Sequence, residues 1–156
     1  MSQPHLFRCQ LTWTGAARGT TRTYDSYSRD YRVDIDGKPS LSGSAAGVYR
    51  GDSARLNPED LLVASLSGCH FLSYLAVCGR AGVEVVDYKD RAEGTMQFKD
   101  GVMRFTEVVL HPEVLVSPGA DLAWAEALHE SAHHSCFIAN SVNFPVRYQA
   151  TVKIRP

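Results

Sequence analysis

Two of the four cysteines occupy positions in which a thiol could act as a nucleophile. Cys69 lies between Gly68 and His70 inside a long apolar segment, and Cys136 ends the later run His133–Cys136. The residues after Cys136 are expected to begin a new helical turn, and a thiol at a helix start gains thiolate character. The thiolate, and not the thiol, is the effective nucleophile. The alternative for Cys69 is a buried cysteine that acts only as a small apolar side chain.

The histidines offer a second chemistry. His70 follows the first of these cysteines, and His129, His133 and His134 precede Cys136. Imidazole nitrogen and thiolate sulfur are ligands that zinc prefers. Adjacent helical residues point about 100° apart, so at most one of His133 and His134 faces the core while the other is solvated. A zinc site is therefore an alternative, although the main interpretation assigns no metal and no cofactor.

The spacing of the cysteines argues against a structural disulfide framework. Cys9 and Cys78 read as structural residues, one on a strand and one near a helix end. The first residues lack the basic start and unbroken apolar run of a secretion signal, so we expect a cytoplasmic protein. In a reducing compartment, any disulfide would be a catalytic or sensing event.

The segment that contains Cys69 reads as a long helix. Asn57 is a good N-cap, Pro58 suits the first helical position, and the run ends at Gly79–Gly82. The residues in between are apolar or small on nearly every side, so we expect this helix to be buried all round. It is long enough to span a bilayer, but its serines and His70 would be costly there and no basic flank marks an inside face. We therefore expect no membrane segment.

The remaining chain alternates between strand patterns and one further helix. Phe7–Trp13 and Thr20–Tyr24 are expected to form an opening hairpin. Another strand is expected at Tyr31–Ile35, followed by a loop at Lys38–Arg55. After the long helix, we expect an antiparallel meander, a helix from about Asp121 and a final strand. The predicted strands after the first helix are Val83–Tyr88, Gly94–Phe98, Met103–Leu115 and Val146–Ile154.

Composition limits the classes of protein. The chain has 156 residues, of which 44% are apolar and 21% charged, which is typical of one globular domain over residues 1–156. There are 16 Lys and Arg against 17 Asp and Glu, and the basic residues form no block that could follow a phosphate backbone. We expect no nucleic acid partner.

One motif resembles a known family. Asn57-Pro58-Glu59-Asp60-Leu61-Leu62 followed by Ser67-Gly68-Cys69 is similar to the signature of the OsmC/Ohr family, which comprises osmotically inducible and organic hydroperoxide resistance proteins. The second family cysteine falls where Cys136 stands. The order of strands and helices also matches the family. The resemblance implies an α+β fold with antiparallel sheets around a long central helix and a second helix.

The resemblance also implies an activity. In that family, the residue at Cys69 is the peroxidatic thiolate, which attacks an organic hydroperoxide and becomes a sulfenic acid. The thiol at Cys136 condenses with it to form a disulfide. A dithiol reductant, in the family often a dihydrolipoyl group on a lipoylated protein, then restores both thiols. The chain is thus expected to be a thiol-dependent peroxidase.

An arginine completes the family's site. It holds the thiolate and polarises the peroxide, and the glutamate at Glu59 orients it. Arg50 and Arg29 both match family positions for this arginine, with a slight preference for Arg50. The chain departs from the family after Cys136, where Phe137 replaces the usual proline. The alternative function is therefore a non-catalytic OsmC-like protein that binds an apolar ligand or zinc.

The long helix also predicts a homodimer. One further helix and small sheets would have difficulty covering an all-apolar helix, so we expect another copy to bury part of it. Glu59 and Cys69 are ten residues apart (69 − 59), or ~15 Å along the axis. We expect two central helices to pack antiparallel, so that Glu59 and its arginine from one subunit approach Cys69 and Cys136 of the other. The active site would then be shared across an intertwined dimer.

Overall fold

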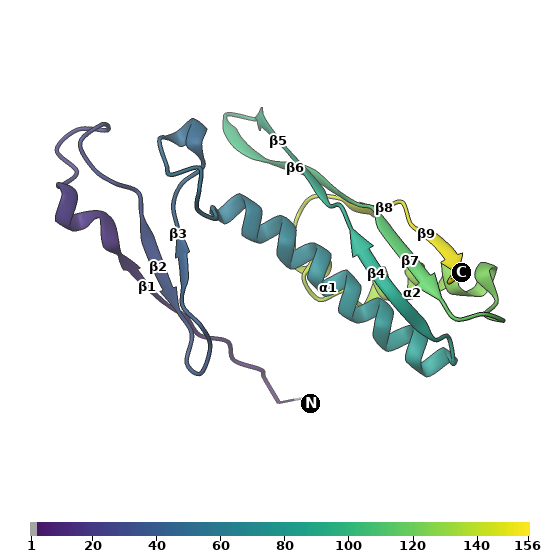
Figure 1. The fold of residues 1–156 in the computed structure, drawn as a ribbon. Coiled ribbons are helices and arrows are strands. Elements are labelled where there is room, and N and C mark those ends of the chain that lie inside the picture. The colour runs from purple at the N-terminus through teal and green to yellow at the C-terminus, as the bar shows by residue number, and fades with distance from the viewer. Residues whose placement is uncertain (1–2) are drawn as a thin grey trace. The chain divides into compact units, whose positions relative to one another are not determined.

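The computed structural model describes residues 3–156. Its contacts divide the chain into two compact units, a first unit that ends at Leu61 and a second unit at Leu62–Pro156. Strands, a long helix, strands, a second helix and final strands follow one another as predicted (Figure 1). The α+β fold class is thereby confirmed. The assignment of residues 1–156 to a single domain stays a prediction.

The first unit is built on one antiparallel sheet. Its strands are β1 (Gln10–Trp13), β2 (Tyr31–Asp34) and β3 (Leu41–Gly43), in that order. Short 3-10 helices lie at Thr14–Arg18 and Gly47–Tyr49. Residues 20–30 connect β1 to β2 without a strand.

Two predictions for this unit are wrong. Thr20–Tyr24 is no strand, because Ser26 Oγ donates to the Thr20 carbonyl and accepts the Thr23 amide, which folds this segment into a turn. The predicted loop contains β3, whose small residues show no hydrophobic period. Gly43 fits there because its backbone lies against the Tyr31 ring, where a Cβ atom would come within 2.3 Å of Tyr31 Cζ.

Buried Asp30 joins the elements of the first unit. Its carboxylate accepts from Arg18 and also pairs with Arg55 at 3.8 Å. Its carbonyl accepts the amides of Thr14 and Gly15. Burial by itself raises the pKa of Asp30, but hydrogen bonds from serine hydroxyls and the two arginine charges bring it below its ordinary value. The carboxylate is therefore a charged structural centre.

The long helix α1 spans Pro58–Ala81. Asn57 Oδ1 accepts the Asp60 amide at 2.8 Å, and the Asp60 carboxylate accepts the Asn57 amide in return. This reciprocal cap fixes the start of the helix where the sequence predicted it. Gly82 (φ 73°) follows the last turn in the left-handed conformation, which glycine adopts without strain. Both predicted ends of this helix are confirmed.

Two three-stranded sheets form the second unit. The first joins β4 (Val85–Asp90) antiparallel to β7 (Pro112–Val116), with β9 (Thr151–Ile154) parallel to β7. The second joins β5 (Glu93–Lys99) antiparallel to β6 (Val102–Leu110), with β8 (Val146–Tyr148) parallel to β6. The predicted meander is therefore only partly right, since β4 pairs with β7 and not with β5.

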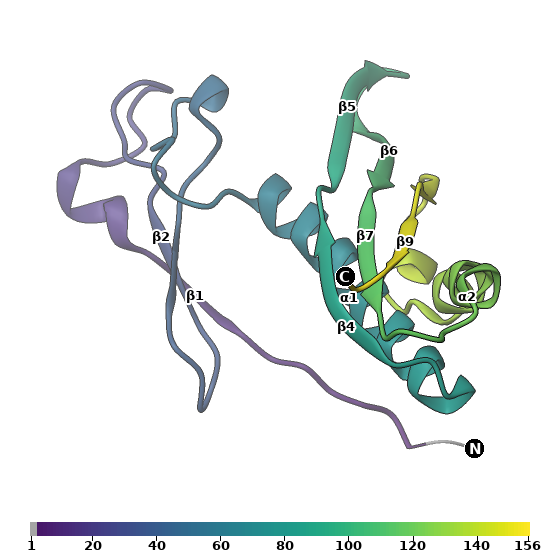
Figure 2. The same cartoon turned by 45° about the vertical axis from the view of Figure 1, so that its right-hand side comes forward.

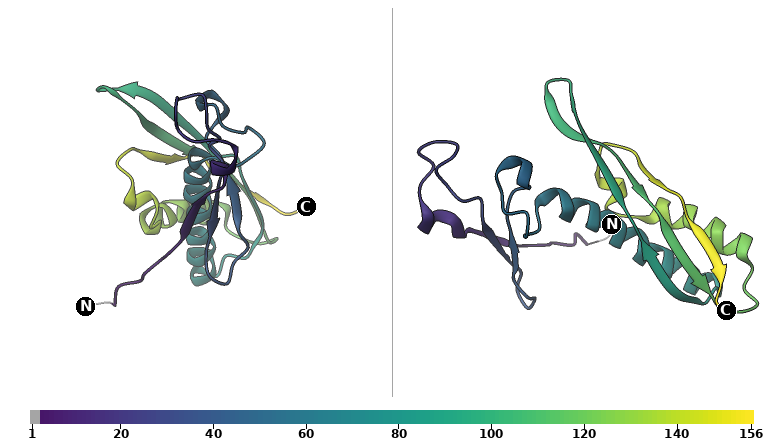
Figure 3. Two further views of the ribbon diagram at one scale, coloured as in Figure 1. Left: turned by 90° about the vertical axis from the view of Figure 1, so that its left-hand side faces the viewer. Right: turned by 45° about the horizontal axis from the view of Figure 1, so that its top comes forward.

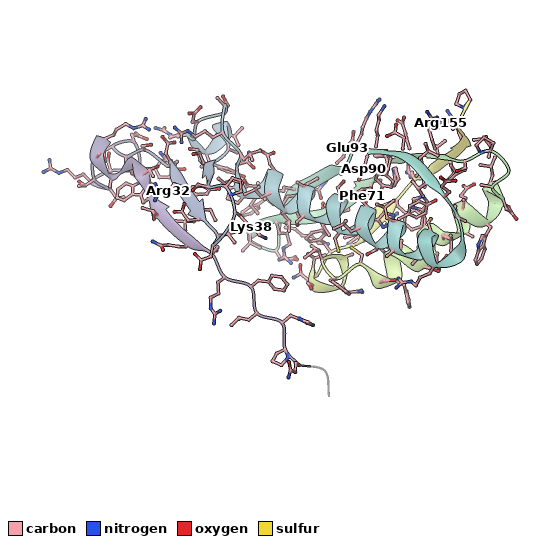
Figure 4. The ribbon with its side chains drawn as sticks, turned by 60° about the horizontal axis from the view of Figure 1, so that its bottom comes forward. Arg32, Lys38, Phe71, Asp90, Glu93 and Arg155 are labelled. Atoms are coloured by element: carbon pink, nitrogen blue, oxygen red, sulfur yellow. The ribbon has the colours of Figure 1, made fainter. Side chains whose placement is uncertain are left out.

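Two long predicted strands break as they pass from one sheet to the other. Between β6 and β7, the His111 amide donates to Asp90 at 2.7 Å instead of joining a ladder. Asp90, labelled in Figure 4, also accepts from Ser67 of α1. Between β8 and β9, the Gln149 amide donates to the Leu110 carbonyl at 2.8 Å. The apolar pattern continues through both breaks, so the sequence alone does not reveal them.

The main core of this unit lies between the two helices and the β4–β7–β9 sheet. The second helix, α2 (Leu122–Ser135), begins at Asp121, whose side chain accepts the Trp124 amide. Both helices cover the same face of this sheet (Figures 2 and 3). The Tyr74 hydroxyl donates to the Ala125 carbonyl at 2.9 Å and ties α1 to α2. The buried residues of this core are Tyr74, Cys78, Val83, Val114, Val116, Ala125, Leu128 and Ala132.

Only one face of α1 is buried. The fully covered residues recur at every fourth position and are Leu66, His70, Tyr74 and Cys78. On another face, Leu72 is 64% exposed. The expectation that the helix is buried all round is therefore wrong for the single chain, because the two sheets and α2 cover only one side of it. By length and composition the helix could cross a membrane, but its buried face carries His70 and Tyr74 within a packed core.

Candidate functional site

The two predicted reactive cysteines lie side by side in the second unit. Cys69, in the middle of α1, is half-buried, whereas Cys136, at the end of α2, is 1% exposed. Both thiols are free. Burial, together with the neighbouring Cys69 thiol, raises the pKa of Cys136 to about 11. Cys136 is therefore held as a neutral thiol beside a more accessible one.

A compact turn follows Cys136. The Asn140 amide donates to the Cys136 carbonyl at 3.0 Å, and the Ser141 hydroxyl donates to the Phe137 carbonyl at 2.7 Å. The Asn140 side chain also donates to the His134 carbonyl at 3.0 Å. These hydrogen bonds constrain the backbone where the family usually has a proline. The absence of proline therefore does not leave this turn without local support.

The turn also contacts Cys69. The backbone N–H of Ile138 donates to Cys69 Sγ at an N···S distance of 3.5 Å. Ile138 is the residue before the 3-10 turn Ala139–Ser141. Sequence reasoning missed this contact, because a backbone donor leaves no side-chain signal in the sequence.

Cys69 opens onto an apolar groove of about 630 Å³. Leu72 and Phe137, which line it, are 64% and 80% exposed. Exposed apolar side chains that gather beside a half-buried thiol can hold the carbon chain of a substrate or ligand. The groove is lined by Ser65, Gly68, Cys69, Leu72, Ser73, Ala76, Arg80, Ser135, Phe137 and Ile138.

A pair of fully buried histidines lies behind Cys69 in the core. His70 Nε2 and His129 Nδ1 are 3.1 Å apart. The rings are nearly parallel, at 9°, and their centroids are 5.3 Å apart. The nitrogen-to-nitrogen distance plus the radius of each ring nearly equals the distance between the centroids. The two rings therefore lie almost in one plane and meet edge to edge through one N–H···N hydrogen bond. Burial lowers the pKa of His70 to about 4 and that of His129 to about 3.

His133 and His134 differ in their exposure, as the helical geometry predicted. His133 is half-buried and faces the ring of Tyr148 at 5.7 Å, whereas His134 is exposed. Within residues 3–156, no three His, Cys, Asp or Glu side chains lie together in a position to hold a metal ion. The nitrogens that His70 and His129 turn toward each other are engaged in their mutual hydrogen bond. The zinc alternative gains no support from this geometry.

The two candidate arginines belong to the first unit and share one aromatic ring. The guanidinium carbon of Arg29 lies 4.6 Å from the Tyr24 ring centroid, and that of Arg50 lies 5.4 Å from it. Arg29 also donates to the Tyr24 carbonyl at 2.7 Å, and Arg50 forms an ion pair with Asp25. The two family positions thus converge on one cation–π cluster. Sequence reasoning singled out neither Tyr24 nor Asp25.

Glu59 also lies in the first unit, and it is half-buried. Among the described residues, its Oε2 atom is buried without a hydrogen-bond partner. Burial raises the pKa of Tyr31, and the nearby Glu59 charge raises it further. The structure therefore brings Glu59 close to Tyr31. Arg29 instead donates to the Tyr24 and Tyr27 carbonyls, and Arg50 pairs with Asp25.

Known proteins resemble this chain over most of its length. A family model described as OsmC-like protein matches residues 51–150. The uncharacterized protein YmaD of Bacillus subtilis strain 168 is 27% identical over 155 residues, which is 96% of each chain. The structure of an OsmC-like protein of unknown function from Vibrio cholerae has a TM-score of 0.83 at 30% identity, covering 97% of this chain and 100% of that one.

More distant solved structures share the fold. An organic hydroperoxide resistance protein from Elizabethkingia anophelis has a TM-score of 0.71 at 21% identity, over 99% of this chain and 100% of that one. OhrB of Bacillus subtilis has a TM-score of 0.64 at 19% identity, over 96% and 100%. The family model covers both Cys69 and Cys136 and extends over more than half of the sequence. The chain therefore belongs to the OsmC-like protein family.

Proposed function

We propose that this protein reduces organic hydroperoxides, with Cys69 as the attacking thiolate and Cys136 as the resolving thiol. The observation that carries the proposal is the pairing of a half-buried thiol that faces an apolar groove with a fully buried thiol beside it. Structural relatives named organic hydroperoxide resistance proteins support a role with peroxides.

The division of roles follows from burial. Cys69 lines the groove, so a hydroperoxide bound there can reach its sulfur. Cys136 is shielded and stays protonated at neutral pH, because its pKa is raised to about 11. Cys136 is therefore a poor first nucleophile, but it lies beside Cys69 and can react with that residue once it is oxidised.

The reaction has two steps. The Cys69 thiolate forms a bond to the outer peroxide oxygen, the O–O bond breaks, and the alkoxide takes a proton to leave as alcohol. The sulfur of Cys136 then attacks the Cys69 sulfenic acid, and the hydroxyl leaves with the Cys136 proton as water. Two thiols and one hydroperoxide thus yield a disulfide, an alcohol and water. A dithiol reductant, such as a lipoylated protein, would restore the thiols by exchange.

The proposal includes a homodimer with a shared site. The uncovered face of α1, which carries Leu72 at 64% exposure, is suited to burial against a second copy. The buried Glu59 Oε2 atom has no hydrogen-bond partner within residues 3–156, as expected if an arginine pairs with this carboxylate in the assembled dimer. We propose that Glu59 and either Arg50 or Arg29 of one subunit serve Cys69 of the other.

The decisive experiment counts thiols. Addition of one equivalent of an organic hydroperoxide should remove two titratable thiols per chain and release one alcohol. Cys69→Ser should abolish the reaction with little loss of stability, since a serine hydroxyl is a much weaker nucleophile of similar size. Cys136→Ser should still react once and then accumulate sulfinic acid at Cys69. Turnover by the Cys69→Ser protein would refute the proposal.

The shared site has its own test. Cys69→Ser chains mixed with Glu59→Ala chains should regain one competent site in each heterodimer. Heterodimers that form without any gain in activity would show that each subunit carries its own complete site.

The groove also favours a second candidate, a protein that binds an apolar ligand without turnover. Such a protein would bind a fatty acid or similar probe at the groove and lose few thiols when hydroperoxide is added. Thiol counting therefore separates the two functions.

A further inference from the structure

The N–H of Ile138 differs from its neighbours in its choice of acceptor. Within the turn, the amides of Cys136, Asn140 and Ser141 all donate to backbone carbonyls. The amide of Ile138 instead donates to the sulfur of Cys69. A buried or half-buried backbone donor needs an acceptor, and in this turn the acceptor is the sulfur that would attack a peroxide.

The same turn also lies beside the second sulfur, that of Cys136. The nearby backbone amides of Ala139 and Ile138 act against the rise that burial produces in the pKa of Cys136. Here the Ile138 amide faces Cys69, whose sulfur is anionic when it attacks in the proposed reaction.

We infer that the Ile138 N–H is a catalytic donor, which stabilises the anionic sulfur of Cys69 before it attacks the peroxide. The inference rests on the proposed function and adds a group to its machinery. A hydrogen bond to an ionised acceptor is roughly twice as strong as one to a neutral acceptor, so the donor favours thiolate over thiol. It lies in the same unit as both sulfurs and needs no second copy of the chain.

The expected size of the effect is modest. A charge-assisted hydrogen bond of this kind changes the thiolate fraction roughly tenfold, after competition with water. A more stable thiolate is also a weaker nucleophile, and this lowers its reaction rate by about threefold, so only part of the tenfold gain remains. Loss of the donor should therefore slow reactions of Cys69 about threefold at neutral pH and shift its pH profile upward.

The backbone geometry allows a clean deletion of this donor. Ile138 has φ −72°, which lies within the range that proline adopts. Its amide donates to sulfur and to no backbone carbonyl among the described residues. Ile138→Pro therefore removes the donor without requiring a new φ at this position. Ile138→Ala keeps the N–H and removes most of the side chain, so it serves as the matched control.

The experiment measures alkylation by iodoacetamide between about pH 5 and pH 9, residue by residue, by mass spectrometry. Exposed Cys9 is an internal reference in every sample. In Ile138→Pro, Cys69 should react about threefold more slowly at neutral pH, with its profile shifted upward. Because Ile138→Ala keeps the N–H, its Cys69 profile should keep the wild-type pH dependence even where the widened groove alters the absolute rate. Cys9 should not change in either variant. A folded Ile138→Pro protein with the wild-type Cys69 profile would overturn the inference.

A second variant covers the case in which proline prevents folding. Replacement of Ile138 by its α-hydroxy acid converts the amide to an ester, which removes the N–H and keeps the side chain. It should give the same shift at Cys69, and an unchanged profile would equally overturn the inference. Hydroperoxide turnover is measured separately on the wild type. A wild type without turnover refutes the proposed function, whereas turnover with an unchanged alkylation profile in the donor variants refutes the donor alone.

Discussion

Mild acid should destabilise this protein through the buried His70–His129 pair. Both imidazoles are fully buried, and burial lowers their pKa from 6.5 to about 4 and about 3. Between those values and 6.5, the unfolded chain binds protons that the folded chain excludes. Acid therefore favours the unfolded state. The contribution of the pair to stability is complete above about pH 6.5 and declines as the pH falls toward 4.

The magnitude follows from linkage. A histidine that titrates at 6.5 when unfolded and near 4 when folded loses ~2 kcal/mol of stability between about pH 7 and pH 5. His129 loses a similar amount. Together, ~4 kcal/mol is a large share of the 5–15 kcal/mol that is typical of a folded domain. Aspartates and glutamates change little over this interval, because their ordinary pKa values lie below it.

Urea denaturation at several pH values measures the effect. The free energy of unfolding should decrease by several kcal/mol from about pH 7 to pH 5 in the wild type. Exposed His134 is the matched control, and His134→Asn should preserve the wild-type dependence. A double variant, His70→Leu with His129→Leu, should lose most of it. If the wild type and the double variant showed the same pH dependence, the reasoning from burial would be refuted.

Three further substitutions test the packing that positions the site. Leu66→Ala empties a fully buried position and should cost about 2–5 kcal/mol of unfolding free energy in urea titration. Asn57→Ala removes the helix cap and should lower the free energy of unfolding by ~1 kcal/mol. Asn57→Ser, which keeps a capping oxygen, should avoid most of this loss. Asp90→Ala leaves the Ser67 hydroxyl and the His111 amide without their acceptor. It should cost about 2–3 kcal/mol and speed hydrogen exchange at the His111 amide, and an unchanged exchange rate there would contradict the assigned bond.

Local chemistry was predictable from the sequence because its causes are local. The start of α1 depends on Asn57 and Asp60, which contact each other, and its end depends on Gly82. The start of α2 depends likewise on Asp121. Each cap is a choice of residue at one position, and the sequence displays that choice directly.

Strand pairing was less predictable, because it depends on residues distant in sequence. Nothing near β1 indicates that it pairs with Tyr31–Asp34 instead of Thr20–Tyr24. The break at His111 depends on Asp90, which lies on another strand. Alternating apolar residues report which face is buried, but they do not identify the neighbouring strand.

The candidate site shows the same limit. Cys69 and Cys136 were found through a motif, whereas their proximity required the fold. The His70–His129 hydrogen bond joins α1 to α2 and could not be read from either helix. Composition predicted that α1 is apolar on every side, but how much of it one chain covers depends on both sheets and α2.

The strands that follow α2 have a consequence for how the second unit folds. β8 and β9 complete both of its sheets, each by parallel pairing with a central strand, β6 or β7. Until they dock, β6 and β7 are open edges whose unpaired amides and carbonyls could template association with another chain. Pairings between segments so distant in sequence form late and slowly. A nascent or truncated chain without β8 and β9 is therefore the species most exposed to aggregation, and the form for which a chaperone would matter most.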